Sequence, residues 1–448
     1  MFTRLPHPAT TVGATFGAWI ALAPSLLPRS IATQMGALII FTALGTVVGG
    51  LAAVTGPRRW RQLSSSTRRW ALAIAATASL LGTAQSVHWQ NTVRAALPAP
   101  PVNLWWIAAT AITPMMTMAV GIILVHSAAG AVRRLWRRHR AATVAIALAA
   151  ACTAAAIPVS ADAASTATAT ATGGQQQVAV DFTSAAAGPI SQKVYGPLRV
   201  YGSLDSRTYS ERARSMVAQW VARGGMTRRA VVIAVPTGSG WVDGTALAGF
   251  EQRFGGDVAI LAMQYAHEPS WQAFVSGTDA VRDSSVALAR AVVDAVDSVG
   301  RQHHPAIYLY GQSLGAIGAD AAHTAIIADG RNWAICQTVL AGPPAGTVRG
   351  HDPDTIYLLN GSDPVTHWRL SAIWAAPRDP GTATTDLPRP TWLPLVSFLS
   401  TSADLLGALA FPAGHGHRYG AEQGLAVRDC THSAVPYPLQ AIGPRAAS

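Results

Sequence analysis

Long apolar stretches without a charged side chain fill most of the first 160 residues, and they constrain the fold more than any other feature. A helix needs roughly 20 apolar residues to cross the hydrocarbon core of a bilayer. None of these stretches contains Lys, Arg, Asp or Glu, and Trp residues stand near several of their ends, as expected at the headgroup layer. The sequence therefore predicts five membrane-spanning helices, at residues 11–27, 35–54, 70–87, 105–125 and 141–159.

The formal net charge is +11, and most of the excess lies in two arginine clusters between predicted spans. One cluster covers residues 58–69, between the second and third spans, and the other covers residues 133–140, between the fourth and fifth. Arginine-rich loops stay in the cytoplasm. We therefore expect a multi-pass cell-membrane protein whose partner is the lipid bilayer and not nucleic acid, with everything after the fifth span outside the cytoplasm.

A change of composition marks the domain boundary. Residues 160–177 read SADAASTATATATGGQQQ, and such small polar residues indicate a flexible tether. The predicted domains are therefore a transmembrane domain at 1–159, a linker at 160–177 and a catalytic domain at 178–448.

The C-terminal domain alternates short β-branched runs with longer helical stretches, which indicates an α/β fold with a mainly parallel sheet. Helices are expected at 209–223 and 279–299. Strands are expected at 198–201, 230–235, 258–263, 306–310, 338–340 and 355–359.

The strongest chemical signal is the segment Gly311-Gln312-Ser313-Leu314-Gly315, which follows a predicted strand and precedes a helical stretch at 316–328. A G-x-S-x-G sequence in this setting is the nucleophile elbow, whose tight turn exposes the serine hydroxyl above the sheet. Ser313 is therefore the candidate nucleophile. The alternative is a glycine-rich turn with an incidental serine.

A serine hydroxyl needs a histidine to take its proton and an acid to orient that histidine, in this fold in the order serine, acid, histidine. Asp363 follows a predicted strand and is the favoured acid. Glycines flank two candidate bases, and we favour His417 over His415. The remaining candidates are Asp352, Asp354, Asp386 and Asp404 for the acid and His432 for the base.

An oxyanion hole needs the backbone N–H of the residue after the nucleophile and a second N–H from an early loop. Leu314 would supply the first. Thr237 or Gly238, in a loop after the strand at 230–235, would supply the second, and a plain glycine-rich turn is the alternative. The sequence has no P-loop and no cysteine–histidine spacing of the zinc kind, so we expect neither a cofactor nor a metal.

The chain has three cysteines, too few for a disulfide framework. Cys152 lies in an apolar stretch. For Cys336 and Cys430 we expect two buried free thiols, with a bridge between them as the alternative if the region is extracytoplasmic.

Several motifs occur together in a fixed order. They are Ser25-Leu-Leu-Pro-Arg29, Val235-Pro-Thr-Gly-Ser-Gly-Trp-Val242, Met263-Gln-Tyr265, Pro269-Ser-Trp271, Gly311–Gly315, Ser362-Asp-Pro-Val365 and Gly414-His-Gly-His-Arg-Tyr-Gly420. In this set the chain resembles the actinobacterial alpha/beta-hydrolase family membrane proteins, which join an N-terminal multi-span domain to an outward hydrolase domain. The resemblance implies the fold and the membrane location, and no substrate. Glutamate is usual in that family where Gln312 stands, which predicts altered local hydrogen bonding and not lost activity.

The predicted architecture is an N-terminal all-α transmembrane bundle followed by an α/β-hydrolase domain. The predicted function is that of an esterase-like serine hydrolase acting on an ester, in a lipid or cell-envelope substrate. The alternatives are an acyltransferase or peptidase with the same triad, and a non-catalytic scaffold or transporter. The predicted spans carry almost no ionisable residue, which argues against transport.

Overall fold

A computed structural model describes residues 5–57, 63–138, 182, 196–299, 304–347, 353–377 and 383–430. The chain divides into two compact units, and each is made of more than one chain segment. The first comprises Met1–Gly174, Gly342–Arg349 and Tyr357–Tyr419. The second comprises Gln175–Ala341, Gly350–Ile356 and Gly420–Ser448. Late segments of the C-terminal region therefore belong to the same unit as the N-terminal helices.

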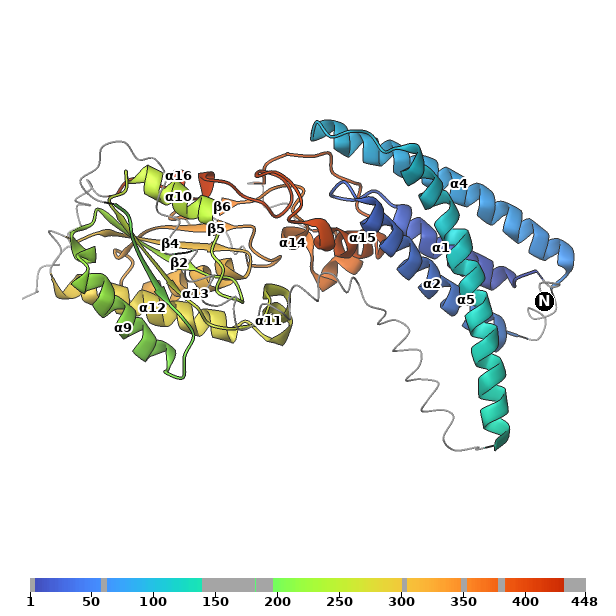
Figure 1. Cartoon of the computed structure of the whole chain (residues 1–448), viewed down its shortest axis with the longest axis horizontal. Coiled ribbons are helices and arrows are strands. Elements are labelled where there is room, and N and C mark those ends of the chain that lie inside the picture. The colour runs from blue at the N-terminus through green and yellow to red at the C-terminus, as the bar shows by residue number, and fades with distance from the viewer. Residues whose placement is uncertain are drawn as a thin grey trace, which may run out of the picture. The chain divides into compact units, whose positions relative to one another are not determined.

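Four N-terminal helices are described in the first unit: α1 (Pro8–Leu22), α2 (Ile31–Thr55), α4 (Ser65–Ala96) and α5 (Leu104–Arg138) (Figure 1). Serine hydroxyls cap the beginnings of α2 and α4, where they accept a hydrogen bond from the third helical N–H. Large apolar side chains such as Leu44, Leu80 and Met115 are exposed on these helices. Such surfaces suit lipid better than water.

Three of the five predicted spans coincide with helices that are long and apolar enough to cross a membrane. These helices are α2, α4 and the Leu104–Leu124 part of α5. The first predicted span, 11–27, differs because α1 ends at Leu22 and has 15 residues. Its length is about 22 Å, whereas the hydrocarbon core is about 30 Å thick. The fifth predicted span, 141–159, lies outside the described residues.

Glycines let α1 and α2 pack with their backbones in close contact. A Cβ atom on Gly45 would lie 2.0 Å from the carbonyl oxygen of Gly13, and one on Gly17 would lie 2.0 Å from that of Phe41. On α2 the pattern is Gly45-x-x-x-Gly49 and on α1 it is Gly13-x-x-x-Gly17. This spacing of small residues is typical of membrane helix pairs, in which close backbone approach replaces the hydrophobic driving force.

Short elements from the C-terminal region complete the first unit. They are α14 (Pro364–His367), the 3-10 turn η2 (Leu370–Ile373), α15 (Val396–Asp404) and the 3-10 turn η3 (Leu405–Gly407). Ala403 of α15 joins an apolar cluster with residues of α1 and α2, among them Ala21 and Leu38.

A six-stranded sheet in the order β1-β3-β2-β4-β5-β6 forms the C-terminal fold. The pairs β1–β3, β3–β2, β2–β4 and β4–β5 are parallel. Strands β2, β3 and β5 are buried along their whole length, as expected of a parallel sheet covered on both faces. The strands are β1 (Leu198–Gly202), β2 (Ala230–Val235), β3 (Val258–Met263), β4 (Ala306–Gln312), β5 (Ile335–Ala341) and β6 (Thr355–Leu358).

Helices cover both faces of the sheet. Figure 1 shows α10 and α16 on one face and α9, α12 and α13 on the other. Their bounds are Tyr209–Ala222 for α9, Gly244–Arg253 for α10, Asp279–Ser298 for α12, Leu314–Ala328 for α13 and Glu422–Leu425 for α16, and the short α11 is Ser270–Ser276. The predicted fold class is confirmed: apolar N-terminal helices precede a parallel sheet of the α/β-hydrolase kind.

A disulfide joins Cys336 of β5 to Cys430, 94 residues later. The expectation of two free thiols is therefore wrong, and the alternative of a bridge is correct. The bridge ties the chain after α16 to the sheet, near the point where the Arg428 amide donates to the Gln337 side chain at 2.9 Å.

The glycine contact between α1 and α2 predicts a sharp difference between two substitutions on α2. Gly45→Ala would force the two backbones apart and cost about 1–3 kcal/mol. Gly36→Ala meets nothing within 4 Å and should be neutral or slightly stabilising. Thermal unfolding of the full chain in detergent, followed by circular dichroism, measures both. Equal melting temperatures for the two variants would contradict the close packing.

Candidate active site

Ser313 lies in a sharp turn between β4 and α13. Its backbone has φ 54° and ψ −124°, a conformation that costs energy for any residue with a Cβ atom and that clusters at functional sites. Its amide donates to the carbonyl oxygen of Ala341 at 2.9 Å. The turn has the geometry expected of a nucleophile elbow.

The flanking glycines are required by close backbone contacts. A Cβ atom on Gly311 would lie 2.2 Å from the Gly315 oxygen, and one on Gly315 would lie 2.4 Å from the Val235 oxygen. The second contact brings the beginning of α13 against the end of β2. Leu314 is the first residue of α13, and N–H groups in the first turn of a helix have no partner within the helix.

The loop after β2 distinguishes the two candidates for the second oxyanion donor. The Thr237 amide donates to the Trp241 oxygen at 2.9 Å, so this N–H is already engaged within the loop. A Cβ atom on Gly238 would lie 2.5 Å from the Glu268 oxygen, so only glycine fits there. Of the two, Gly238 is the better candidate donor.

Asp363 and His417 form a buried pair in the first unit. Asp363 follows β6 and is the N-cap residue of α14, where its side chain accepts from the Val365 amide. Its Oδ2 lies 2.7 Å from His417 Nδ1, and the two side chains are 0% and 8% exposed. The structure thus brings the favoured acid and the favoured base into contact. Ser313 belongs to the second unit.

Tyr419 is a third member of this cluster that the sequence analysis missed. Its hydroxyl donates to Asp363 Oδ2 at 2.7 Å. Burial, and then the charge of Asp363, raise the pKa of Tyr419 well above its ordinary value, so the hydroxyl keeps the proton that it donates. The sequence signal that could have indicated Tyr419 was its position two residues after His417, within the motif Gly414–Gly420.

Backbone contacts hold the base and the acid together. Asn360, at the end of β6, donates from its side-chain amide to the carbonyl oxygens of Gly416 and Arg418. A Cβ atom on Gly342 would lie 2.8 Å from both Asp363 and His417 atoms, so only glycine leaves room for the pair.

His415, the alternative base, pairs with a different acid. Its Nδ1 lies 3.2 Å from Asp386 Oδ2, and its side chain is 25% exposed. Asp386 also accepts hydrogen bonds from the amide and the hydroxyl of Ser362. The Ser362 hydroxyl oxygen accepts from the Gly416 amide at 2.8 Å. This second pair therefore braces the turn that carries His417.

The other candidates are placed elsewhere or lie outside the described residues. Asp354 pairs with Arg428 in the second unit, and Asp404 pairs with Arg29 in the first. Asp352 and His432 are outside the described residues. Among the residues that the structure describes, no group of three or more His, Cys, Asp or Glu side chains could hold a metal ion.

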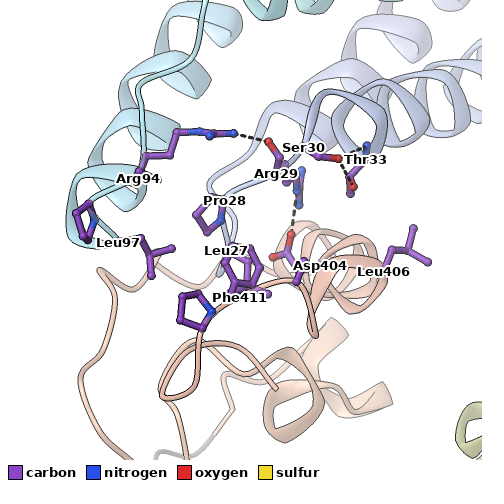
Figure 2. Close-up of a pocket in the computed structure, with 15 residues that line it drawn as sticks. Leu27, Pro28, Arg29, Ser30, Thr33, Arg94, Leu97, Asp404, Leu406 and Phe411 are labelled. Carbon is purple, nitrogen blue, oxygen red and sulfur yellow. Dashed lines mark hydrogen bonds and ion pairs between the residues drawn. The ribbon is translucent and has the colours of Figure 1, made fainter. Parts of the chain in front are cut away.

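A cavity of about 590 Å³ lies in the first unit, between the α1–α2 loop, the end of α4 and the segment that follows α15 (Figure 2). Arg29 and Asp404 are on its wall, and the Arg94 guanidinium on the same wall donates to the Arg29 carbonyl oxygen at 2.8 Å. Apolar side chains such as Leu97 and Phe411 make up much of the rest.

Two family models match the chain. One, described as alpha/beta-hydrolase family, matches residues 198–351 and 347–434, and the other, described as alpha/beta-hydrolase family N-terminus, matches residues 22–190. The chain belongs to the alpha/beta-hydrolase family. The expected membership of the alpha/beta-hydrolase family is thus confirmed, and the N-terminal match covers α2, α4 and α5 of this family member.

No curated protein matches this alpha/beta-hydrolase family member. Among solved structures it is similar to "RedJ-Thioesterase from the Prodiginine biosynthetic pathway in Streptomyces coelicolor", at 22% identity and a TM-score of 0.18. That match covers 28% of this chain and 45% of the thioesterase, so the chain spans less than half of the thioesterase's length.

The Tyr419–Asp363 contact predicts the cost of removing one hydroxyl. Tyr419→Phe should destabilise the fold by about 1.5–3 kcal/mol, because the hydrogen bond ends on a buried carboxylate. Tyr310→Phe removes a buried hydrogen bond to the neutral Gln423 side chain, at 2.8 Å, and should cost about 0.5–1.5 kcal/mol. Denaturant unfolding of the two variants compares them. A smaller loss for Tyr419→Phe than for Tyr310→Phe would contradict the stronger hydrogen bond expected between Tyr419 and Asp363.

Proposed function

We propose that the protein is a membrane-anchored serine hydrolase with Ser313 as nucleophile, His417 as base and Asp363 as the orienting acid. The observation that carries the proposal is the 2.7 Å contact between the buried side chains of Asp363 (Oδ2) and His417 (Nδ1). An acid bound at Nδ1 fixes the tautomer of the imidazole and assigns Nε2 to proton transfer.

The proposed reaction follows from the chemistry of these groups. Ser313 Oγ attacks the ester carbonyl carbon while His417 Nε2 takes the hydroxyl proton. The amides of Leu314 and Gly238 donate to the resulting oxyanion. His417 then returns the proton to the leaving alcohol, and a water molecule activated by the same histidine releases the acid and restores Ser313. An acyl acceptor in place of water would make the protein a transferase.

Family membership and the elbow geometry support the enzyme class. Burial of His417 and partial exposure of His415 support the choice between the two histidines. The membrane-length helices support an ester substrate that reaches the site from the bilayer, a lipid or cell-envelope ester. The structural neighbour does not bear on the substrate, because its similarity is too low to carry an argument.

A fluorophosphonate probe tests the nucleophile, the base and the acid in the full chain. The wild type should react, and Ser313→Ala should not. His417→Ala and Asp363→Asn should slow labelling by about 10³-fold or more. His415→Ala should slow it by about tenfold at most, because Asp386 and His415 brace the turn without taking the proton.

Ser298→Ala, which removes an exposed hydroxyl at the end of α12, is the matched control and should react like the wild type. Labelling of Ser313→Ala at the wild-type rate would refute the assignment of the nucleophile. A stronger effect of His415→Ala than of His417→Ala would exchange the roles of the two histidines.

We also propose that the hydrolase domain lies outside the cytoplasm. The arginine clusters support this orientation, and so does the Cys336–Cys430 disulfide, since such bonds persist in oxidising compartments. In a Cys152→Ser background, an impermeant reductant followed by an impermeant maleimide should label Cys430 in intact cells. Labelling that requires permeabilised cells would place the domain in the cytoplasm.

A further inference from the structure

The loop between α1 and α2 carries a buried arginine that contacts the C-terminal region. Arg29 Nε lies 2.9 Å from Asp404 Oδ1 at the end of α15, and the two side chains are 2% and 0% exposed. The other guanidinium nitrogens donate to the Ala21 carbonyl oxygen at 2.8 Å and to the Ser400 hydroxyl at 2.8 Å. Figure 2 shows the Arg29–Asp404 pair between the loop and the helix.

The same loop binds α15 through its backbone as well. The Leu26 amide donates to Asp404 Oδ2 at 2.8 Å, so both carboxylate oxygens are engaged by the loop. The Ser400 hydroxyl donates to the Pro24 carbonyl oxygen at 3.2 Å. These contacts fix both the position and the rotation of the last turn of α15 relative to the loop.

The loop is itself held by residues of α4. Gln90 of α4 accepts from the Arg29 amide at 2.8 Å and donates to the Ser25 hydroxyl at 2.9 Å. Trp89 donates to the Ser25 carbonyl oxygen, and Arg94 donates to that of Arg29. These contacts with α4 define the conformation of the loop independently of its contacts with α15.

A short path leads from Asp404 to the candidate base. After the single turn η3, the carbonyl oxygen of Ala408 accepts from the His417 amide at 2.8 Å. A Cβ atom on Gly416 would lie 2.6 Å from the same oxygen and 3.4 Å from the Leu27 side chain. Leu27 and Ala408 also share an apolar cluster, with Phe411 packed against it. The turn that carries His417 therefore rests on the α1–α2 loop.

We infer that Arg29 and Asp404 are positioning residues for His417, so that the membrane-helix region is part of the catalytic apparatus as well as an anchor. A buried ion pair adds little net stability because its desolvation offsets its attraction, but it can enforce one arrangement of the elements that it joins. Displacement of a catalytic group by about 1 Å can lower the rate by about 100-fold. The kinetic part of this inference rests on the proposed function, and the structural part does not.

A double variant separates positioning from stability. Arg29→Met with Asp404→Asn leaves no unpaired charge and keeps a side-chain acceptor for the Leu26 amide. The matched control is Arg199→Met with Glu251→Gln in the second unit, where a pair that is also buried lies at 2.6 Å. Both full-length variants are compared with the wild type by thermal unfolding, by hydrogen exchange of the peptide that contains the His417 amide, and by ester hydrolysis.

In the Arg29/Asp404 variant we expect kcat to fall about 10- to 100-fold with KM within about threefold, because the substrate contacts are not touched. Exchange of the 405–419 peptide should rise, since the Ala408 carbonyl is no longer held. The melting temperatures of the two variants should be similar. In the Arg199/Glu251 control, kcat and the exchange of this peptide should match the wild type.

Three results would overturn the inference. Unchanged exchange of the 405–419 peptide would show that the pair does not hold the turn, whether or not the protein is a hydrolase. Raised exchange with unchanged kcat would show that the held turn does not affect the chemistry. Equal losses of kcat in the two variants would reduce the pair to a general stabilising contact. Failure of the proposed function is recognised separately, by equal probe labelling of the wild type and Ser313→Ala.

Discussion

The first unit depends on the burial of one arginine–aspartate pair. Both Arg29 and Asp404 are removed from water, and each would be an uncompensated charge if the other moved away. Hydrogen bonds to the Ser400 hydroxyl, the Ala21 oxygen and the Leu26 amide occupy the remaining polar atoms. Because these hydrogen bonds come from several directions, the Arg29 and Asp404 side chains have few alternative positions. The pair therefore joins two segments about 375 residues apart in one arrangement, and the chain after α15 begins from a defined point.

The division into units follows from the same contacts. Asp404 pairs with Arg29, and Ala403, Leu387 and Ala408 share apolar clusters with residues of the N-terminal region, although the sequence assigns all four to the hydrolase domain. As a result, the candidate nucleophile belongs to the unit built around the sheet, whereas the candidate acid and base belong to the unit that contains the N-terminal helices.

The sequence was most informative where structure is local or periodic. Five of the six strands were predicted close to their observed bounds, because buried parallel strands are short, nearly continuous apolar runs. The exception is β5, predicted at 338–340 and observed from Ile335, because Gln337 interrupts the apolar pattern. Burial of the Gln337 side chain is tolerated because its oxygen accepts a hydrogen bond from the Arg428 amide. The elbow at Ser313 was predictable because its glycines are required by contacts within a few residues or with the adjacent strand.

Contacts between distant residues left no such pattern. Pro24 is consistent with a helix that ends at Leu22, because proline disfavours the helical conformation in the residue before it. Nothing near Pro24 indicates that the following loop binds Asp404, and no spacing rule pairs cysteines 94 residues apart. Asp404 and Asp386 were recognised as possible acids, but the sequence could not show which cation or histidine each would meet. Tyr419 was missed because an aromatic residue beside a glycine is not a catalytic pattern until Asp363 is known to lie 2.7 Å away.

The two histidines of the Gly-His-Gly-His motif have complementary roles in this arrangement. His415 contacts Asp386, and Asp386 holds Ser362, the residue before the candidate acid. The Ser362 hydroxyl in turn accepts from Gly416, the residue before the candidate base. A hydrogen bond between the two neighbouring positions limits how far the acid and the base can separate. The Asp386–His415 pair thus supports the backbone of the turn, whereas Asp363–His417 is the pair that we propose for proton transfer.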